Sequence, residues 1–131
     1  MLGRPGARIE KAAKVVELIR QSRNYGWVGL YDVGPELVSI MAYSGPGASA
    51  YPQFPVTKGF TAAAIREKKT VVVGDVRTDP RYLTAFGNTL SEIIIPVLDE
   101  KSSVVVGTID VESEQANAFL GRRPAGAGRV P

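Results

Sequence analysis

Two apolar stretches rich in β-branched residues, near the C-terminal end of the chain, constrain its fold more than any other feature. They run from residue 92 to 98 and from residue 104 to 111, and only the five polar residues 99–103 separate them. A polar turn of this length between two such stretches predicts an antiparallel β-hairpin. We therefore expect a sheet in which antiparallel pairing dominates.

Three further stretches complete the predicted sheet. Residues 27–33 and 37–43 read as strands joined by a turn at Gly34, Pro35 and Glu36, which predicts a second hairpin. In the first of these strands, alternation places Trp27, Gly29, Tyr31 and Val33 on one face. Residues 70–74 are almost purely β-branched and form the fifth predicted strand.

Helices are predicted between these strands and on either side of them. Residues 7–23 carry apolar side chains at spacings of three and four, which is typical of an amphipathic helix, and residues 59–68 predict a short one. Ser113 is expected to cap a brief helix that ends near Leu120. This order of elements predicts an α+β fold, a mainly antiparallel sheet backed by helices.

Two long segments between the predicted elements are irregular but contain aromatic residues. Residues 44–57 and 75–87 hold too many glycines and prolines for a regular element. Their aromatic side chains are Tyr51, Phe54, Tyr82 and Phe86. Because long loops in compact domains are often functional, we expect these segments to cover a cavity that the aromatic residues line.

The length and charge of the chain fit one domain with short flanking segments. We predict a flexible N-terminus over residues 1–8, one domain over 9–120 and a disordered tail over 121–131. The tail holds three arginines and no acid, and without it the chain has equal numbers of basic and acidic residues. No stretch is long and apolar enough for a membrane helix. We expect a soluble cytoplasmic protein that binds neither nucleic acid nor membrane.

The 131 residues include no cysteine and no histidine. This excludes thiol nucleophiles, disulfides, Cys/His zinc sites, catalytic triads with histidine, and histidine-ligated haem. Carboxylate acid–base chemistry, a metal held by oxygen atoms, a Lys or Tyr nucleophile, or binding without reaction remain. We predict no catalytic residue, no cofactor and no metal site, and we interpret Asp75 and Asp79 as turn-capping residues.

Three segments resemble the GAF family of small-molecule sensor domains. They are Asp-Val-x-x-Asp-Pro-Arg at 75–81, Ser-Glu-Ile-Ile-Ile-Pro-Val at 91–97 and Gly-Thr-Ile-Asp-Val-Glu-Ser at 107–113, and the likeness covers roughly residues 9–120. The resemblance implies a five-stranded antiparallel sheet in the order 2-1-5-4-3, backed by helices. It also implies a ligand cavity roofed by the two irregular segments.

Within that family the chain is most similar to the free methionine-R-sulfoxide reductases, but it lacks their cysteines. Their pocket combines a Trp-x-x-x-Tyr strand, a glutamate on the Ser-Glu strand and two acidic residues on the final strand. The matching residues here are Trp27, Tyr31, Glu92, Asp110 and Glu112, the last with Glu for the family's Asp. Thr61 and Ala85 stand at the cysteine positions, and neither side chain can attack a sulfoxide as a thiolate does.

The three acidic residues indicate the chemistry of the ligand. Carboxylates brought together by paired strands repel one another unless a cation lies between them, and an ammonium group is the obvious candidate. The full predicted ligand-binding set is Trp27, Tyr31, Tyr51, Phe54, Thr61, Tyr82, Phe86, Glu92, Asp110 and Glu112. Alternatively, Trp27 and Tyr31 are core aromatics and Glu112 is a solvated acid at a strand end.

Three functions remain open at this stage. The leading hypothesis is a non-catalytic sensor domain that binds a small amino-containing metabolite. The alternatives are a divergent enzyme of the sulfoxide-reductase type, working through carboxylates or an external thiol, and a structural dimerisation module with a collapsed pocket. Many GAF domains have a final helix beside the first one, and this sequence shows no such pattern. We therefore expect the first helix to form a homodimer through Val15 and Leu18.

Overall fold

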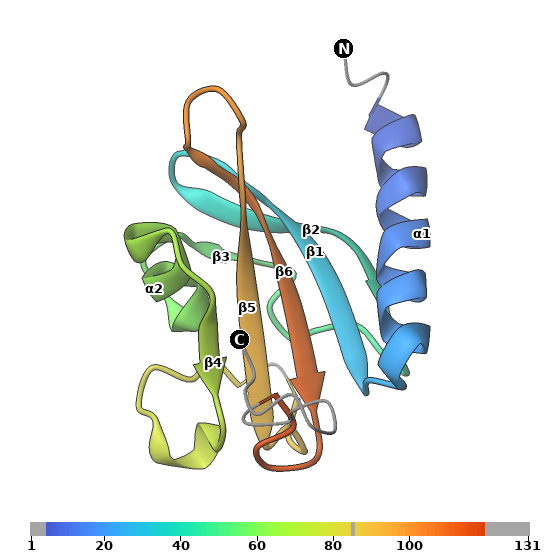
Figure 1. The fold of residues 1–131 in the computed structure, drawn as a ribbon, viewed down its shortest axis with the longest axis vertical. Coiled ribbons are helices and arrows are strands. Elements are labelled where there is room, and N and C mark those ends of the chain that lie inside the picture. The colour runs from blue at the N-terminus through green and yellow to red at the C-terminus, as the bar shows by residue number, and fades with distance from the viewer. Residues whose placement is uncertain (1–4, 85, 120–131) are drawn as a thin grey trace, which may run out of the picture.

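The structure is a computed structural model that describes residues 5–84 and 86–119. Its centre is one antiparallel sheet in the order β3-β2-β1-β6-β5-β4 (Figure 1). The strands are β1 (Trp27–Val33), β2 (Leu37–Ser44), β3 (Gln53–Pro55), β4 (Val71–Val73), β5 (Ser91–Leu98) and β6 (Val105–Ser113). The predicted α+β fold and the order of its five strands are confirmed, with β3 added at one edge.

Helix α1 (Pro5–Arg23) covers one face of the sheet. Its Val16 is fully buried against Val28 of β1 and Val111 of β6, which form the apolar cluster on this face. A polar link adds to the packing, because Arg20 Nε donates to Ser44 Oγ at 2.7 Å and that hydroxyl donates to Glu17. No helix among the described residues is both long and apolar enough to cross a membrane.

Helix α2 (Gly59–Glu67) lies over the opposite face of the sheet. Two apolar clusters form the core there. Phe60 and Ala64 of α2 pack with Ile94 of β5 in one cluster, and Tyr31 and Phe54 belong to the other. The full clusters are Phe60, Ala64, Val73, Val76 and Ile94, and Trp27, Tyr31, Val38 and Phe54. This divided face is the one that holds the polar site described below.

Strand β3 lies in the first irregular segment, which was expected to be a loop because of its glycines and its prolines, Pro52 and Pro55 among them. It forms nevertheless at the edge of the sheet, where Phe54 lies opposite Val38 and one side of the backbone needs no partner. The Ile40 N–H donates to the Pro52 carbonyl and extends this pairing by one bond. The extra strand ties part of the first irregular segment to the sheet.

The predicted helix after Ser113 is wrong. Strand β6 continues through Ser113, because Ser91 pairs with it and the Leu90 N–H donates to its carbonyl oxygen. Residues 114–119 form turns, and the Ser113 hydroxyl accepts from the Gln115 N–H instead of capping a helix. At the other end, α1 begins at Pro5, so residues 5–8 are helical where a flexible segment was expected. Residues 1–4 and 120–131, including the predicted tail, lie outside the described residues.

Candidate functional site

Three carboxylates from neighbouring strands meet on the α2 side of the sheet. Glu92 of β5 lies directly opposite Glu112 of β6, and Asp110 is two residues before Glu112 on the same face. Each offers an oxygen, and the three oxygens lie within 4.8 Å of one another. Only 5%, 7% and 3% of the surfaces of Glu92, Asp110 and Glu112 are exposed. The strand pattern thus places three acids at one point between the two apolar clusters.

Few hydrogen bonds satisfy these acids. Thr89 Oγ1 donates to Glu112 Oε1 at 2.6 Å. Asp110 Oδ1 is buried without a hydrogen-bond partner among the described residues. The described residues that line this pocket include neither lysine nor arginine. The cluster is therefore a concentration of buried acceptors without a side-chain cation to neutralise it.

Burial changes the ionisation of all three groups. It raises the pKa of Asp110 to about 6, although hydrogen bonds with Glu92 and Glu112 act in the opposite direction. Burial and then the charge of Asp110 raise the pKa of Glu112 to about 8, and the same causes raise that of Glu92 well above its usual range. The acids therefore share protons at neutral pH, and a cation that entered would displace them.

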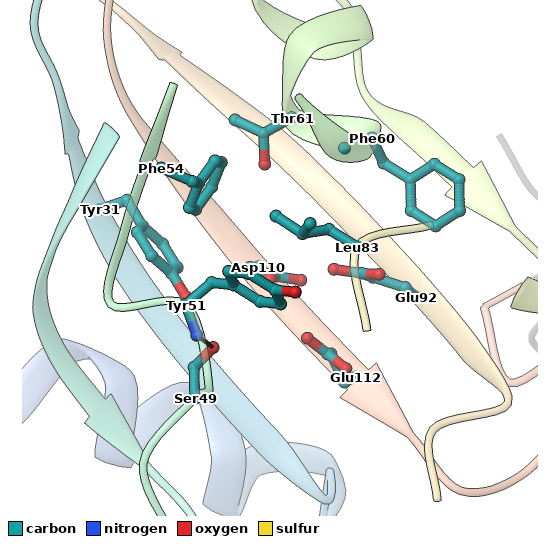
Figure 2. A pocket seen from close by; sticks show the side chains of 11 residues that line it. Tyr31, Ser49, Tyr51, Phe54, Phe60, Thr61, Leu83, Glu92, Asp110 and Glu112 are labelled. Atoms are coloured by element: carbon teal, nitrogen blue, oxygen red, sulfur yellow. Dashed lines mark hydrogen bonds between the residues drawn. The ribbon is translucent and has the colours of Figure 1, made fainter. Parts of the chain in front are cut away.

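The walls of the pocket come from both irregular segments and from α2 (Figure 2). The free space between them is about 20 Å³, which is room for one water molecule. The lining residues are Tyr31, Ser49, Tyr51, Phe54, Gly59, Phe60, Thr61, Leu83, Glu92, Asp110 and Glu112. Seven of the ten predicted site residues are among them: Tyr31, Tyr51, Phe54, Thr61, Glu92, Asp110 and Glu112.

Trp27 is a buried aromatic that does not line this pocket. Its indole lies over Gly29, where a Cβ atom would come within 2.4 Å of Trp27 Cη2, so the ring occupies the space above the glycine. Trp27 Nε1 donates to the Gly47 carbonyl at 2.9 Å, and its ring packs on Phe86 with centroids 5.1 Å apart. Trp27 and Phe86 instead line a neighbouring crevice that also touches Glu112.

Tyr82 lies outside the pocket as well. Its ring stacks on Phe60 with centroids 5.8 Å apart, and it lines a groove on the outer side of α2. Ala85, the second position matched to a cysteine, lies outside the described residues.

Sequence reasoning missed four lining residues, Ser49, Gly59, Phe60 and Leu83. Gly59 and Leu83 each stand two residues before a position matched to a cysteine, and Phe60 directly precedes one, a signal that could have found them. Ser49 stands in a run of small residues with no distinguishing feature.

The other acids weighed for a metal site serve as caps, as interpreted from the sequence. Asp75 Oδ1 accepts from the Arg77 N–H at 3.0 Å and begins the short 3-10 helix η1 (Val76–Thr78). Asp79 Oδ1 accepts from the Arg81 N–H at 2.9 Å. Only the cluster of Glu92, Asp110 and Glu112, among the described residues, offers three oxygens close enough to hold one cation. That cation can be an ammonium group or a divalent metal ion with oxygen ligands.

Comparisons with known proteins agree with this architecture. The family model described as GAF domain matches residues 12–123. GAF domain-containing protein A of Dictyostelium discoideum is 29% identical over 113 residues, which cover 86% of this chain and 69% of that protein.

Solved structures similar to this chain include two free methionine-R-sulfoxide reductases. The type II enzyme from Thermoplasma acidophilum has a TM-score of 0.78 and 25% identity, with 84% of this chain and 77% of that chain covered. The enzyme from Neisseria meningitidis, solved with its substrate, has a TM-score of 0.77 and 26% identity; 85% of this chain is covered, but only 65% of that chain.

Proposed function

Because this chain belongs to the GAF domain family, whose members commonly bind small molecules as sensor domains, we propose that it binds a small metabolite carrying a protonated amino group and does not transform it. In this proposal the ammonium group lies among the carboxylates of Glu92, Asp110 and Glu112. The aromatic rings of Tyr31, Tyr51 and Phe54 enclose the rest of the ligand.

The unpartnered Asp110 Oδ1 carries this proposal. A buried acceptor without a partner costs about 1 to 3 kcal/mol, and more when it is charged. An ammonium group donates three hydrogen bonds and supplies a positive charge, so it offsets this cost at the same time as it satisfies the neighbouring acids. An apolar or anionic ligand would leave the cost in place.

The absence of cysteine from the sequence supports binding without reaction. Thr61, at one position matched to a family cysteine, is buried in the pocket wall, and a threonine hydroxyl is not a thiolate at neutral pH. Reduction of a sulfoxide needs a thiolate to attack sulfur and a second thiol to release the enzyme.

Calorimetric titration with a panel of primary amines and amino acids tests this proposal. Asp110→Asn should weaken binding by about 1.5 to 3 kcal/mol, the usual contribution of a charge-assisted hydrogen bond. Glu100→Gln in the exposed β5–β6 turn is the matched control and should leave affinity unchanged. Equal affinities for wild type and Asp110→Asn would overturn the proposal. Binding of Ca²⁺, Mg²⁺ or Mn²⁺ without binding of any amine would also overturn it.

One observation favours a second candidate, a divergent sulfoxide reductase that uses external thiols. Glu112, whose pKa is about 8, carries a proton at neutral pH and could donate it to a sulfoxide oxygen. Two external thiols would supply the two electrons, so that sulfoxide and two thiols give thioether, disulfide and water. Turnover of free methionine sulfoxide with dithiothreitol above the uncatalysed rate would establish this candidate and contradict the non-catalytic one.

We also propose that α1 forms a homodimer interface. Ala12 and Val16 face the sheet, whereas Val15 and Leu18 are 41% and 67% exposed on the flank of the helix. Exposed apolar side chains that adjoin one another on a helix favour contact with a second copy about a two-fold axis.

Light scattering of the double variant Val15→Glu and Leu18→Glu should report monomers. Leu37→Glu, also at an exposed leucine, should leave the dimer intact. A wild-type monomer at micromolar concentration would contradict the interface.

A further inference from the structure

A second space lies directly outside the carboxylate pocket. It is a groove of about 370 Å³ between α2 and residues 80–83. Small residues of α2 let the two segments approach, and the groove is lined by Thr57, Lys58, Gly59, Ala62, Ala63, Arg66, Pro80, Arg81, Tyr82 and Leu83. Two of these residues, Gly59 and Leu83, border both the groove and the pocket. They form the partition between the two spaces.

Leu83 supplies the side chain of this partition. Figure 2 shows its side chain lying between Thr61 and the carboxylates. A Cβ atom on Gly59 would lie 3.4 Å from Leu83 Cβ, an ordinary van der Waals distance, so Leu83 packs closely against the start of α2. This contact is purely van der Waals. On the opposite wall, the Ser49 hydroxyl accepts a hydrogen bond from the Tyr51 N–H at 3.0 Å.

An amine can enter the closed pocket only if one part of the wall moves. Its free space of about 20 Å³ holds one water molecule, and even a small organic amine is several times larger. The groove outside is wide enough for a ligand of that size. Because Leu83 separates the two, its displacement toward the groove joins them into one site.

The pocket and the groove on the two sides of Leu83 carry side chains of opposite charge. Inside lie the three carboxylates, whereas the rim of the groove carries Lys58, Arg66 and Arg81. Arg81 is paired with Asp79 at 2.7 Å, and Arg66 makes only a long, exposed contact with Glu67 at 3.5 Å. No carboxylate among the described residues lies within the 4.0 Å of an ion pair from the Lys58 ammonium group. Lys58 and Arg66 are thus the cations most available to a ligand.

We propose that this groove is a second ligand subsite, in which Lys58 binds an anionic group and Arg66 adds to the positive charge of the rim, and that Leu83 packed on Gly59 is the gate between it and the carboxylates. The inference rests on the proposed function and narrows its ligand class to a compact zwitterion, with the ammonium group inside and the anion outside. A simple amine gains nothing from the rim and is repelled there, whereas a zwitterion with no net charge is attracted at both ends.

The subsite is tested with two series of probes, ω-amino acids of two to five carbons and alkylamines of the same lengths. Calorimetry should give at least one amino acid about tenfold tighter binding than its matched amine, the usual scale of one charge-assisted contact. Lys58→Gln should abolish this preference without weakening binding of the amine. Lys101→Gln, in the exposed β5–β6 turn, is the matched control and should preserve the preference.

The gate is tested by the rate of association in stopped-flow mixing. Leu83→Ala should accelerate binding of both series severalfold, and Leu37→Ala, at an exposed leucine of β2, should not. Faster binding in Tyr51→Ala but not in Leu83→Ala would overturn the gate and place the entrance beside the other wall.

The outcomes separate the two proposals. Equal affinity for amines and amino acids, unchanged by Lys58→Gln but reduced by Asp110→Asn, would overturn the anionic subsite and leave the proposed function standing. If neither series binds to wild type, both proposals fail.

Discussion

Acidic side chains occur in two contrasting environments in this molecule. In residues 75–81 each aspartate meets an arginine two positions later. Arg77 donates through Nε and Nη2 to Asp75 at 2.9 and 2.8 Å, and Arg81 makes the same paired contact with Asp79. These hydrogen bonds lower the pKa of Asp75 to about 2 and lower that of Asp79. At the carboxylate cluster of Glu92, Asp110 and Glu112, burial raises every pKa instead.

The difference shows which acids stabilise the fold and which do not. Each surface aspartate pairs with an arginine of its own turn and caps that turn, so its charge is already balanced within the chain. The buried acids lie between two apolar clusters, and no lysine or arginine stands among the described residues of their pocket. Buried charges without partners destabilise a fold, so this arrangement is retained at a cost to stability. The proposed site for a cation from outside the chain would account for that cost.

The pH dependence of stability is the strongest test of this contrast. A carboxyl group whose pKa is raised on folding stabilises the fold below its unfolded pKa, and this contribution is lost as the pH rises through the folded pKa. Because Glu112 titrates near 8 and Asp110 near 6, the free energy of unfolding should be at least about 2 kcal/mol lower at pH 8 than at pH 6. Asp75 and Asp79 have the opposite sign, so their contribution is lost as the pH falls from about 4 toward 2.

Urea denaturation between about pH 2 and pH 9 measures both limbs of this profile. The triple variant Glu92→Gln, Asp110→Asn, Glu112→Gln should flatten the limb between pH 6 and 8, and Asp75→Asn should leave it unchanged. A wild-type profile that is flat from pH 6 to 8 would contradict the raised pKa values.

Ligand affinity should depend on pH in the opposite direction to stability. A cation that enters the cluster displaces shared protons, so amine binding should strengthen by up to about tenfold per pH unit between pH 6 and 8 for each proton released. Calorimetry in two buffers with different ionisation enthalpies counts these protons directly. Binding that is independent of pH, with no proton released, would place the amine away from the carboxylates.

Neutralising one buried acid should stabilise the free protein. At pH 8 Asp110 is ionised and its Oδ1 has no partner, so Asp110→Asn should raise the free energy of unfolding by about 1 to 2 kcal/mol. The gain should shrink at pH 5, where Asp110 is protonated. A loss of stability at pH 8 would mean that the Asp110 carboxylate has a stabilising partner in the folded protein. That result would contradict the contrast with the surface pairs.

The sequence predicted the frame of the fold and the meeting of the three carboxylates because both follow from the alternation of residues along the strands. Alternation in residues 92–98 and 104–111 predicts the central hairpin, and the same alternation puts Asp110 and Glu112 on one face. The edge strand β3 escaped prediction because its prolines are breakers everywhere except at an edge. The error after Ser113 has a similar cause, since pairing with Ser91 extends the strand through a residue suited to a helix cap.

The walls of the site were harder to predict than its floor. Tyr82 and Phe86 belong to the correct loop, but whether an aromatic ring points into a pocket depends on packing that no sequence period reports. Leu83, between them in the chain, is the residue of this loop that lines the carboxylate pocket. Trp27 shares a strand face with Tyr31, but its ring lies over Gly29 and does not line the pocket.

The smallest predicted effect belongs to the surface pairs. Asp79→Asn removes the charge that faces Arg81 but keeps an oxygen for the Arg81 N–H, so the loss in unfolding free energy should stay below about 1 kcal/mol. It should also vanish in 0.5 M NaCl, because exposed ion pairs are screened by salt. The gain from Asp110→Asn at pH 8 should persist in the same salt, since a buried charge is screened much less. Urea denaturation of both variants at low and high salt makes this comparison. A salt-independent loss above about 2 kcal/mol for Asp79→Asn would contradict the small contribution that we assign to exposed ion pairs.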